Sequence, residues 1–250
     1  MHSRAVRTTA LQLIDAGTSL NSISKRLGVS RSTLRDWRDR STPVRDRATC
    51  FRCSPAPRLP PERPYAHLLG LYLGDGCIAL LRRGVYSLRV ACCDDYPRLM
   101  AECASSIRAI RPGPVSFVAS QGCTYVTKYW KHWPCVFPQH GIGRKHERQF
   151  SLDDWQAEIV ERNPGVFLRG LFQSDGCRVM NWTVRTVDGK PKRYEYVRYF
   201  FTNKSSDIMA MCQWALGLVG VRWTMPKPDT LSVARKPDVA LLDEFIGPKS

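Results

Sequence analysis

The chain has no long hydrophobic run. No stretch approaches the roughly 18 consecutive apolar residues that a membrane-spanning helix needs, and no apolar segment follows Met1, as a secretory signal would require. These two absences predict a protein that stays in the cytoplasm and contacts no membrane. Cysteine is also scarce for a disulfide scaffold, because the chain has 10 in 250 residues, against roughly 8–10% in such scaffolds. We therefore expect free thiols in a reducing compartment.

Acidic residues are few relative to basic ones. The chain contains 22 aspartates and glutamates and 38 lysines and arginines, so its formal net charge at pH 7 is +16. Charged residues make up only 24% of the chain and hydrophobic residues 43%, which is the composition of a folded protein. Half of the excess positive charge lies in residues 1–64. This asymmetry favours a polyanionic partner, since each basic side chain laid on a phosphate releases counterions. The alternative is a basic surface that only keeps the protein soluble.

Residues 1–41 have the pattern of a small all-helical domain. Apolar residues recur at helical spacing in three segments, 4–16, 21–27 and 31–40. Between the second and third segments, Gly28 permits a tight turn and Ser30 can cap the next helix. This spacing resembles the helix-turn-helix of resolvases and transposases. The third helix would then present a polar edge to the major groove of DNA, made of Arg31, Ser32, Arg35 and Arg38. A three-helix bundle used for protein contact is the alternative.

Residues 42–63 are rich in proline and arginine, which disfavours both helix and central strand and predicts a linker. The linker contains a CxxC motif, Cys50 and Cys53. Two thiolates are not enough for a structural Zn²⁺ ion, which takes four ligands. The best candidates for the other two ligands are Cys135 and His140. The alternative is that Cys50 and Cys53 are ordinary linker thiols.

A repeat with a spacing of one hundred residues dominates the rest of the chain. Residues 68–77 read LLGLYLGDGC and residues 168–177 read LRGLFQSDGC. Each copy has the spacing of a core helix and ends at an Asp-Gly pair, whose glycine suits a left-handed conformation. Small residues four positions apart predict that the two helices pack closely face to face. These are Gly70 and Gly74 in one copy, and Gly170 and Ser174 in the other.

The acids that end the two copies, Asp75 and Asp175, would then meet. Two carboxylates at adjoining helix C-termini repel each other and the negative helix ends. Their proximity is costly unless a divalent cation lies between them, and oxygen ligands of this kind suit Mg²⁺. Two similar core helices that end in ordinary Asp-Gly turns are the alternative.

The same order of strands and helices follows each copy. After the first copy, strands are expected over 77–81, 86–92, 115–119 and 124–129, and helices over 97–110 and from 131 onward. After the second copy, strands are expected over 178–187, 194–202, 221–225 and 230–234, and helices over 207–218 and 238–245. Residues 64–150 and 151–250 therefore both read αββαββα. The sequence predicts an α+β fold of two pseudo-symmetric halves, preceded by the helical domain.

The paired motifs resemble the two copies of the LAGLIDADG motif in the monomeric form of that homing-endonuclease family. The resemblance covers about residues 64–246. It implies that the motif helices form the central interface and that the two sheets form a saddle over double-stranded DNA. It also implies that Asp75 and Asp175, with the carbonyls of Gly74 and Ser174, hold two or three Mg²⁺ ions.

In that family, basic residues near the end of each fourth strand polarise the solvent. The equivalent residues here are Lys131 and Lys236, and each has an alternative role as a phosphate contact. Lys128 and Arg235 are alternative candidates for the same role. The sequence departs from the family at the sixth motif position, where Leu73 and Gln173 replace an acid. That position lies away from the metal in the family.

Strand residues and the basic segment between the halves are candidates for DNA contact. Alternation along the strands predicts one face rich in charged groups that can enter the major groove. The candidates are Arg89 in the first half and Arg178, Arg185, Arg193 and Arg198 in the second. Between the halves, the glycine-hinged stretch 141–148 would track phosphates through Arg144 and Lys145. A general-base role for His140 or His146 ranks below metal ligation or phosphate contact.

Together these patterns favour a monomeric, Mg²⁺-dependent endonuclease of the cytoplasm and nucleoid that hydrolyses both strands of DNA at a specific site. A non-catalytic transcriptional regulator on the same scaffold is the main alternative, and an RNA-splicing maturase is a further one. Retention of both acids favours the enzyme, because a pure binding protein gains nothing from two carboxylates that repel each other. No pattern in the sequence specifies the target site.

Overall fold

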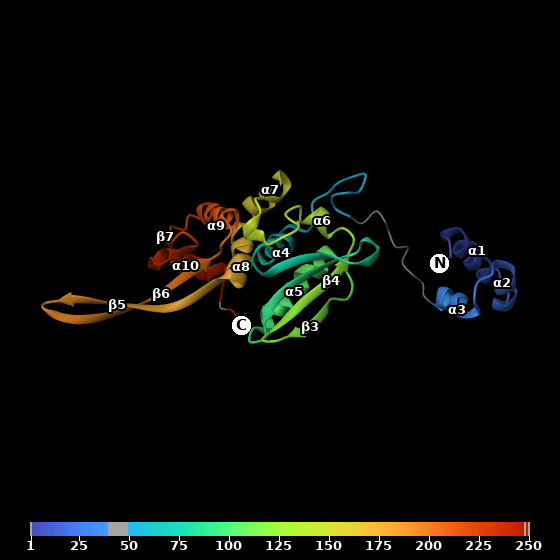
Figure 1. The fold of residues 1–250 in the computed structure, drawn as a ribbon, viewed down its shortest axis with the longest axis horizontal. Helices are drawn as coiled ribbons and strands as arrows, with labels where there is room; N and C mark the ends of the chain where they lie inside the picture. Colours follow the sequence, from blue (N-terminus) through green and yellow to red (C-terminus); the bar gives the residue numbers. More distant parts are fainter. Residues whose placement is uncertain (1, 40–49, 248, 250) are drawn as a thin grey trace. The chain divides into compact units, whose positions relative to one another are not determined.

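The computed structural model describes residues 2–39, 50–247 and 249 (Figure 1). The chain divides into two compact units, Met1–Thr49 and Cys50–Ser250. Residues 40–49, which include the end of the predicted third helix and the first part of the predicted linker, lie outside the described residues. The CxxC motif therefore belongs to the second unit.

The first unit consists of three short helices. These are α1 (Arg4–Asp15), α2 (Leu20–Leu27) and α3 (Arg31–Asp39). Their apolar faces meet at Ala10, Ile23, Val29 and Leu34, which are at most 1% exposed. Gly28 ends α2 with a φ of 64°, and the Ser30 hydroxyl accepts a hydrogen bond from Thr33 N at 3.1 Å. The predicted turn and cap of a helix-turn-helix are both formed.

The second unit repeats one arrangement of elements. Its first copy is α4 (Glu62–Asp75), β1 (Gly76–Leu80), β2 (Tyr86–Cys93), α5 (Pro97–Ile110), β3 (Ser116–Ser120), β4 (Cys123–Trp130) and α6 (Trp133–Val136). Its second copy is α8 (Pro164–Asp175), β5 (Gly176–Val187), β6 (Lys190–Thr202), α9 (Ser206–Leu218), β7 (Thr224–Lys227), β8 (Thr230–Val233) and α10 (Lys236–Phe245). Each copy forms an antiparallel sheet, in the orders β1-β2-β4-β3 and β5-β6-β8-β7. The predicted α+β fold with two αββαββα halves is confirmed.

Two segments differ from the predicted pattern. Helix α7 (Asp154–Arg162), which the sequence analysis did not predict, precedes α8 and begins with a capping box of Asp153 and Gln156. The strand expected over 221–225 is β7, which begins only at Thr224. Val221 lies in the core directly after α9, and its burial there accounts for the apolar signal without a strand.

Strands β5 and β6 form a hairpin that is longer than its counterpart in the first half. They have 12 and 13 residues, whereas β1 and β2 have 5 and 8. Strand β8 pairs with β6 only over Tyr199–Thr202. Among the described residues no third strand pairs with the outer part of the hairpin, and Figure 1 shows this part as an arm that extends beyond its sheet.

Helices α4 and α8 pack against each other through their glycines. A Cβ atom added to Gly70 would lie 2.5 Å from the carbonyl oxygen of Phe167 and 2.7 Å from Leu171 N. A Cβ atom on Gly170 would come even closer to the carbonyl oxygen of His67. Since real Cβ atoms do not approach backbone this closely, only glycine fits at either position. The close face-to-face packing predicted from the repeat is present.

The glycine that follows each aspartate is required for a different reason from the one predicted. Gly76 and Gly176 are in extended conformations, with φ of −87° and −101°, rather than left-handed ones. Each helix passes directly into a strand at this residue. A Cβ atom on Gly76 would lie 2.5 Å from Tyr72 Cα, and one on Gly176 would lie 2.7 Å from Phe172 Cα. Steric exclusion, not positive φ, therefore selects glycine here.

A buried polar network crosses the helix interface beside the glycines. His67 Nε2 lies 2.7 Å from Gln173 Oε1, and Gln173 Nε2 donates to Glu102 at 3.3 Å. Arg169 forms an ion pair of 2.7 Å with the same glutamate. An acid in place of Gln173 would set a second negative charge beside Glu102 in this buried place, which is costly. The network therefore accounts for the departure from the family motif at this position.

Replacing Gly70 by alanine tests the helix packing. We expect Gly70→Ala to lower the free energy of unfolding of the second unit by about 3 kcal/mol or more, because the new methyl group meets backbone atoms that cannot rotate away. Urea denaturation followed by circular dichroism measures the change.

Gly217→Ala is the matched control, because a Cβ atom at this position in α9 meets nothing within 4 Å. Its stability should be unchanged or raised by up to about 1 kcal/mol. Equal losses in the two variants would contradict the close packing of α4 on α8.

Candidate active site

The two motif helices end beside each other, each in an aspartate. Asp75 is the last residue of α4 and Asp175 the last residue of α8. The ends are so close that a Cβ atom on Gly74 would lie 2.8 Å from Asp175 Oδ2. Asp75 remains accessible to solvent and Asp175 is half-buried. The two acids that occupy matching positions in the repeat therefore share one site.

Crowding and charge both act on these carboxyl groups. Partial desolvation raises the pKa of Asp75 to about 6, and the negative charge of Asp175 adds to the shift. Desolvation also raises the pKa of Asp175, while a hydrogen bond of 2.7 Å from Asn203 Nδ2 to Asp175 Oδ2 opposes the rise. Both shifts have the sign expected of an ionised pair that is costly to maintain at neutral pH.

Two lysines face the ends of the motif helices. Lys145 Nζ donates hydrogen bonds to the carbonyls of Tyr72, Leu73 at 2.9 Å and Gly74 at 3.0 Å. Lys249 Nζ donates to the carbonyl of Ser174 at 3.2 Å. Both ammonium groups lie where the helix dipole is negative, and their charge opposes the rise of both aspartate pKa values. Burial lowers the pKa of Lys145 to about 8.

Lys145 and Lys249 come from segments near the ends of the two halves. Lys145 begins the short 3₁₀ helix Lys145–Glu147 after α6, and Lys249 follows α10. Lys145 was predicted to contact phosphates, and Lys249 was not among the predicted site residues. No repeat position marks the two as a pair, since the hundred-residue spacing places Lys145 opposite Phe245.

The lysines predicted from the fourth strands lie elsewhere. Lys131 is exposed directly after β4, and Lys236 is exposed at the first residue of α10. The alternative candidate Lys128 is buried and donates to the carbonyls of Pro112 and Pro114. The lysine charges that act on the pKa values of the two aspartates are those of Lys145 and Lys249. The catalytic roles of Lys131 and Lys236 stay predictions.

A basic cavity of about 460 Å³ lies beside Asp175 and the end of α4. Asp175 and Asn203 line it together with cationic or titratable side chains from the segment between the halves and from the end of β6. These side chains are Arg144, Lys145, His146, Arg148 and Lys204. A second cavity of about 320 Å³ contains Lys249 and Arg178. Both cavities therefore place positive charge near the ends of the motif helices.

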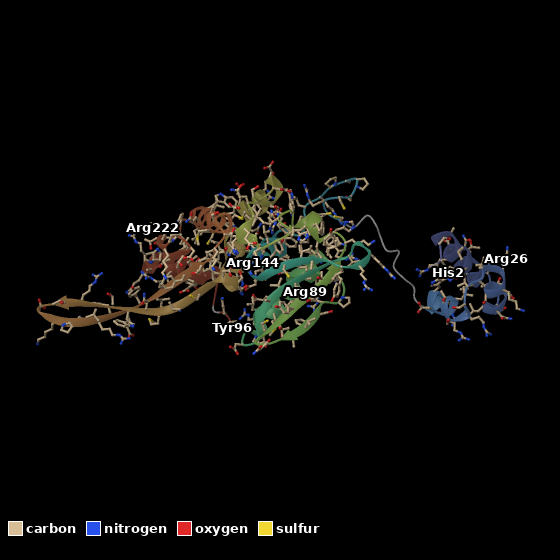
Figure 2. The ribbon with its side chains drawn as sticks, in the orientation of Figure 1. His2, Arg26, Arg89, Tyr96, Arg144 and Arg222 are labelled. Carbon is tan, nitrogen blue, oxygen red and sulfur yellow. The ribbon has the colours of Figure 1, made fainter. Side chains whose placement is uncertain are left out.

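The predicted sheet arginines do not all lie on one face. Arg89 projects from β2 and is exposed, and Arg144 projects from the segment between the halves (Figure 2). In the second sheet, Arg178 lies opposite Tyr199 and binds Asp243 of α10 at 2.8 Å, so it is on the helix-covered face.

Strand alternation then fixes the other positions in the second sheet. Arg193 lies on the same face as Arg178, whereas Arg185 and Arg198 lie on the open face. Arg193 also stacks over Trp182, with 4.9 Å to the ring centroid. The prediction that all four arginines read DNA from one face is wrong. Side chains alternate between the two faces along a strand, so residues 178 and 185 lie on opposite faces.

In the first unit, the predicted groove-reading edge of α3 is accessible. Arg31, Ser32, Arg35 and Arg38 are all exposed. This edge lies opposite the buried Leu34.

Three of the four predicted zinc ligands lie together. Cys50, Cys53 and Cys135 converge, but the fourth member of the cluster is His132 instead of His140. His140 lies against the ring of Tyr86, with centroids 5.6 Å apart. His132 precedes Cys135 by three residues, about one helical turn, which keeps both on one side of α6. His140 comes after the helix has ended.

None of the helices in the described ranges is long and apolar enough to span a membrane.

The first 43 residues match a family model described as a homeodomain-like domain. No curated protein sequence matches the chain. The prediction of an N-terminal helix-turn-helix domain is confirmed by the family match and by the three helices of the first unit.

Several solved structures are similar to the chain. A variant of I-DmoI in complex with its target DNA and in the presence of manganese is 15% identical, with a TM-score of 0.47, and the match covers 74% of this chain and 94% of that one. The N-terminal LAGLIDADG domain of WhiA is 14% identical, with a TM-score of 0.43 and coverage of 76% and 83%. The homing endonuclease I-WcaI bound to its DNA recognition sequence is 12% identical, with a TM-score of 0.48 and coverage of 76% and 83%. The names agree with the resemblance drawn from the motifs, while the fold itself rests on the chain's own elements.

The raised pKa of Asp75 predicts that the free energy of unfolding of the metal-free protein depends on pH. This pKa is about 6 in the folded state and 3.8 in the reference state. Between these two pH values the folded chain binds more protons than the unfolded chain, so the free energy of unfolding falls as the pH rises from about 4 to about 6. Asp75→Asn removes the titrating group. We expect the stability of Asp75→Asn relative to the parent to increase between pH 4 and pH 7 by about 1 kcal/mol, less than the full shift because solvent screens this carboxyl.

Thermal unfolding in EDTA at a series of pH values measures this difference. Asp154→Asn, at an exposed carboxyl of α7, is the control for the removal of a surface carboxylate. A difference for Asp75→Asn that is constant from pH 4 to pH 7 would contradict the raised pKa of Asp75.

Proposed function

We propose that this chain is a metal-dependent endonuclease that hydrolyses double-stranded DNA at a specific site. The observation that carries the proposal is the convergence of Asp75 and Asp175, from repeated motifs, at the ends of two packed helices. Both copies of the motif are in one polypeptide. The paired site therefore forms within a monomer and needs no second chain.

The donor set at this site fits a hard divalent cation. Two carboxylates supply the oxygen ligands that Mg²⁺ prefers, and a cation would offset the repulsion that raises the Asp75 pKa. The carbonyls that precede the aspartates accept hydrogen bonds from two lysines, but a carbonyl oxygen has a second lone pair. Asp75 and Asp175, assisted by the carbonyls of Gly74 and Ser174, are thus the residues that would hold Mg²⁺.

When bound, the metal would act as a Lewis acid on the scissile phosphate and would stabilise negative charge in the transition state. The chain's own groups have distinct tasks. Asn203 orients the Asp175 carboxylate through its hydrogen bond. The ammonium groups of Lys145 and Lys249 supply fixed positive charge beside the two carboxylates. In the adjoining cavity, cationic side chains such as Arg148 can bind the flanking phosphates.

Three surfaces are suited to contact DNA away from the cleavage site. The edge of α3 suits a major groove, and the exposed Arg89 lies on the first sheet. The open face of the long hairpin presents Arg185 opposite Lys192. With a net charge of +16, these surfaces would give an affinity that depends strongly on salt. Such a protein would associate with the nucleoid.

A non-catalytic DNA-binding regulator is the second candidate, and the two lysines favour it. Lys145 and Lys249 place ammonium groups at the negative ends of α4 and α8, so the charge of both aspartates is partly offset without a metal. A scaffold stabilised in this way can retain its acids for structural reasons alone. The cleavage experiment below separates the two functions.

Cleavage should depend on both aspartates. Duplexes are first selected from a randomised library by binding to the full chain in EDTA, and Mg²⁺ is then added. We expect double-strand breaks from the parent, and rates lower by about 100-fold or more from Asp75→Asn and Asp175→Asn, because each substitution removes a charged metal ligand. Gel electrophoresis with sequencing of the ends measures the breaks.

Asp154→Asn again serves as the control and should cleave at the parental rate. Mg²⁺ should also raise the melting temperature of the parent more than that of either active-site variant. Tight binding by the parent without breaks, unchanged by the two substitutions, would contradict the endonuclease and favour the regulator.

The open face of the β5–β6 hairpin should contribute phosphate contacts. We expect the double variant Arg185→Ala, Lys192→Ala to bind all duplexes more weakly and to lower the slope of log affinity against log salt by about 1 to 2, one contact for each side chain lost. Fluorescence anisotropy at several salt concentrations measures the slope.

Arg98→Ala is the control, since this side chain is 71% exposed on the helix-covered side and pairs with Glu102. Its slope should equal that of the parent. A hairpin variant with the parental slope would show that the arm does not contact phosphates.

A further inference from the structure

A cluster of three cysteines and one histidine lies apart from the paired aspartates. Cys50 and Cys53 belong to the segment that precedes α4, whereas His132 and Cys135 belong to the start of α6. The two pairs are separated by 79 positions between Cys53 and His132. Their four ligand atoms all lie within 4.8 Å of one another.

The distances within the cluster match those around a small tetrahedral ion. With Zn–S bonds of about 2.3 Å and a Zn–N bond of about 2.0 Å, the edges of the ligand tetrahedron are about 3.5 to 3.8 Å long. His132 Nδ1 lies 3.1 Å from Cys53 Sγ and 3.9 Å from Cys135 Sγ. These two edges bracket the expected length, so small shifts would place an ion at the centre.

Neighbouring groups hold the ligands in this orientation. The backbone N–H of Cys53 donates to Cys50 Sγ at 3.4 Å, which orients this sulfur. The His132 ring packs edge-on against Trp130, with centroids 5.4 Å apart. Support of this kind around metal ligands fixes their orientation and raises affinity.

The charge around the cluster is also suitable. Three thiolates, one neutral imidazole and Zn²⁺ have a net charge of −1. Arg111 and Lys131 carry positive charge beside His132, and Arg111 stacks on Trp130 at 5.6 Å. These cations would stabilise the anionic metal centre.

We propose that Cys50, Cys53, His132 and Cys135 bind one structural Zn²⁺ ion. Four protein ligands fill a tetrahedral shell and leave no position for substrate, so the ion has a structural role. It fastens the beginning of the second unit to α6, across a long stretch of intervening chain.

The local structure explains why such a fastening is needed. Residues 50–61 form no helix or strand, and one backbone hydrogen bond, from Arg58 N to Phe51 O at 2.7 Å, closes their turn. Cys50 is nevertheless only 1% exposed. The ion would fix Cys50, the first residue of the second unit, against the rest of that unit. It would thereby also fix the point from which the chain continues toward the first unit.

Metal analysis of the full chain tests the proposal. Protein purified under reducing conditions without chelators should contain about one Zn²⁺ per chain. Cys53→Ala and His132→Ala should each lower that content to a small fraction of the parental value. Cobalt substituted into the parent should give the absorption bands of a tetrahedral thiolate site.

Cys123→Ser is the matched control, since this thiol at the start of β4 is outside the cluster, and it should retain the zinc of the parent. If the variants fold poorly, the parent alone decides, because removal of zinc by a chelator should lower its melting temperature and added Zn²⁺ should restore it. Parent that contains no zinc and takes none up when reduced would overturn the proposal, as would undiminished zinc in folded Cys53→Ala and His132→Ala. A Cys50–Cys53 disulfide that persists in reductant and excludes Zn²⁺ would also overturn it. None of these results depends on DNA cleavage.

Discussion

The contact of α4 with α8 through Gly70 and Gly170 is the constraint on which the rest of the second unit depends. Backbone meets backbone at this crossing, because a Cβ atom at either position would overlap carbonyl groups of the other helix. Each helix continues for five residues beyond its glycine, about 7.5 Å along the axis, and ends in an aspartate. Helices of this length are stiff, so the glycine crossing determines how closely the two carboxylates approach. Larger side chains at the two glycine positions would increase the distance between the helices. The two carboxylates would then move apart and would no longer share one site.

Bringing two helix C-termini and two carboxylates together concentrates negative charge in one place, and a lysine contacts each helix end. Lys145 and Lys249 each donate to the carbonyls at the end of one motif helix. In the metal-free protein the charges of these ammonium groups lower the pKa values of both aspartates. A divalent cation at the proposed site would act in the same direction, so its binding would be coupled electrostatically to the lysine contacts. This coupling explains how one arrangement of residues is compatible with an endonuclease and with a binding scaffold.

The sequence predicts those features that depend on local periodicity and on the repeat. It predicts both sheets, the paired helices and the meeting of Asp75 with Asp175, because the hundred-residue spacing brings equivalent positions together at a pseudo-twofold interface. It does not predict His132 as the fourth member of the cysteine cluster, since that choice depends on where α6 ends. The positions of Lys145 and Lys249 at the helix ends are not predicted either, because both come from segments whose return path is not encoded in any periodicity. The prediction that the glycines after the aspartates are left-handed is wrong, because α4 and α8 pass directly into strands at these residues.

The two halves are alike at their interface and different at their edges, and this combination has a consequence for recognition. A dimer of identical subunits has two equal DNA-binding surfaces and therefore requires a DNA target with two equal half-sites related by twofold symmetry. Here the arm formed by β5 and β6 has 12 and 13 residues, where the first half has strands of 5 and 8. The symmetric glycine interface keeps the acids paired, while each sheet is free to carry its own set of contact residues. If the chain binds DNA as proposed, it would read two unlike half-sites, because the symmetry needed at the centre does not extend to the surfaces that would touch the bases.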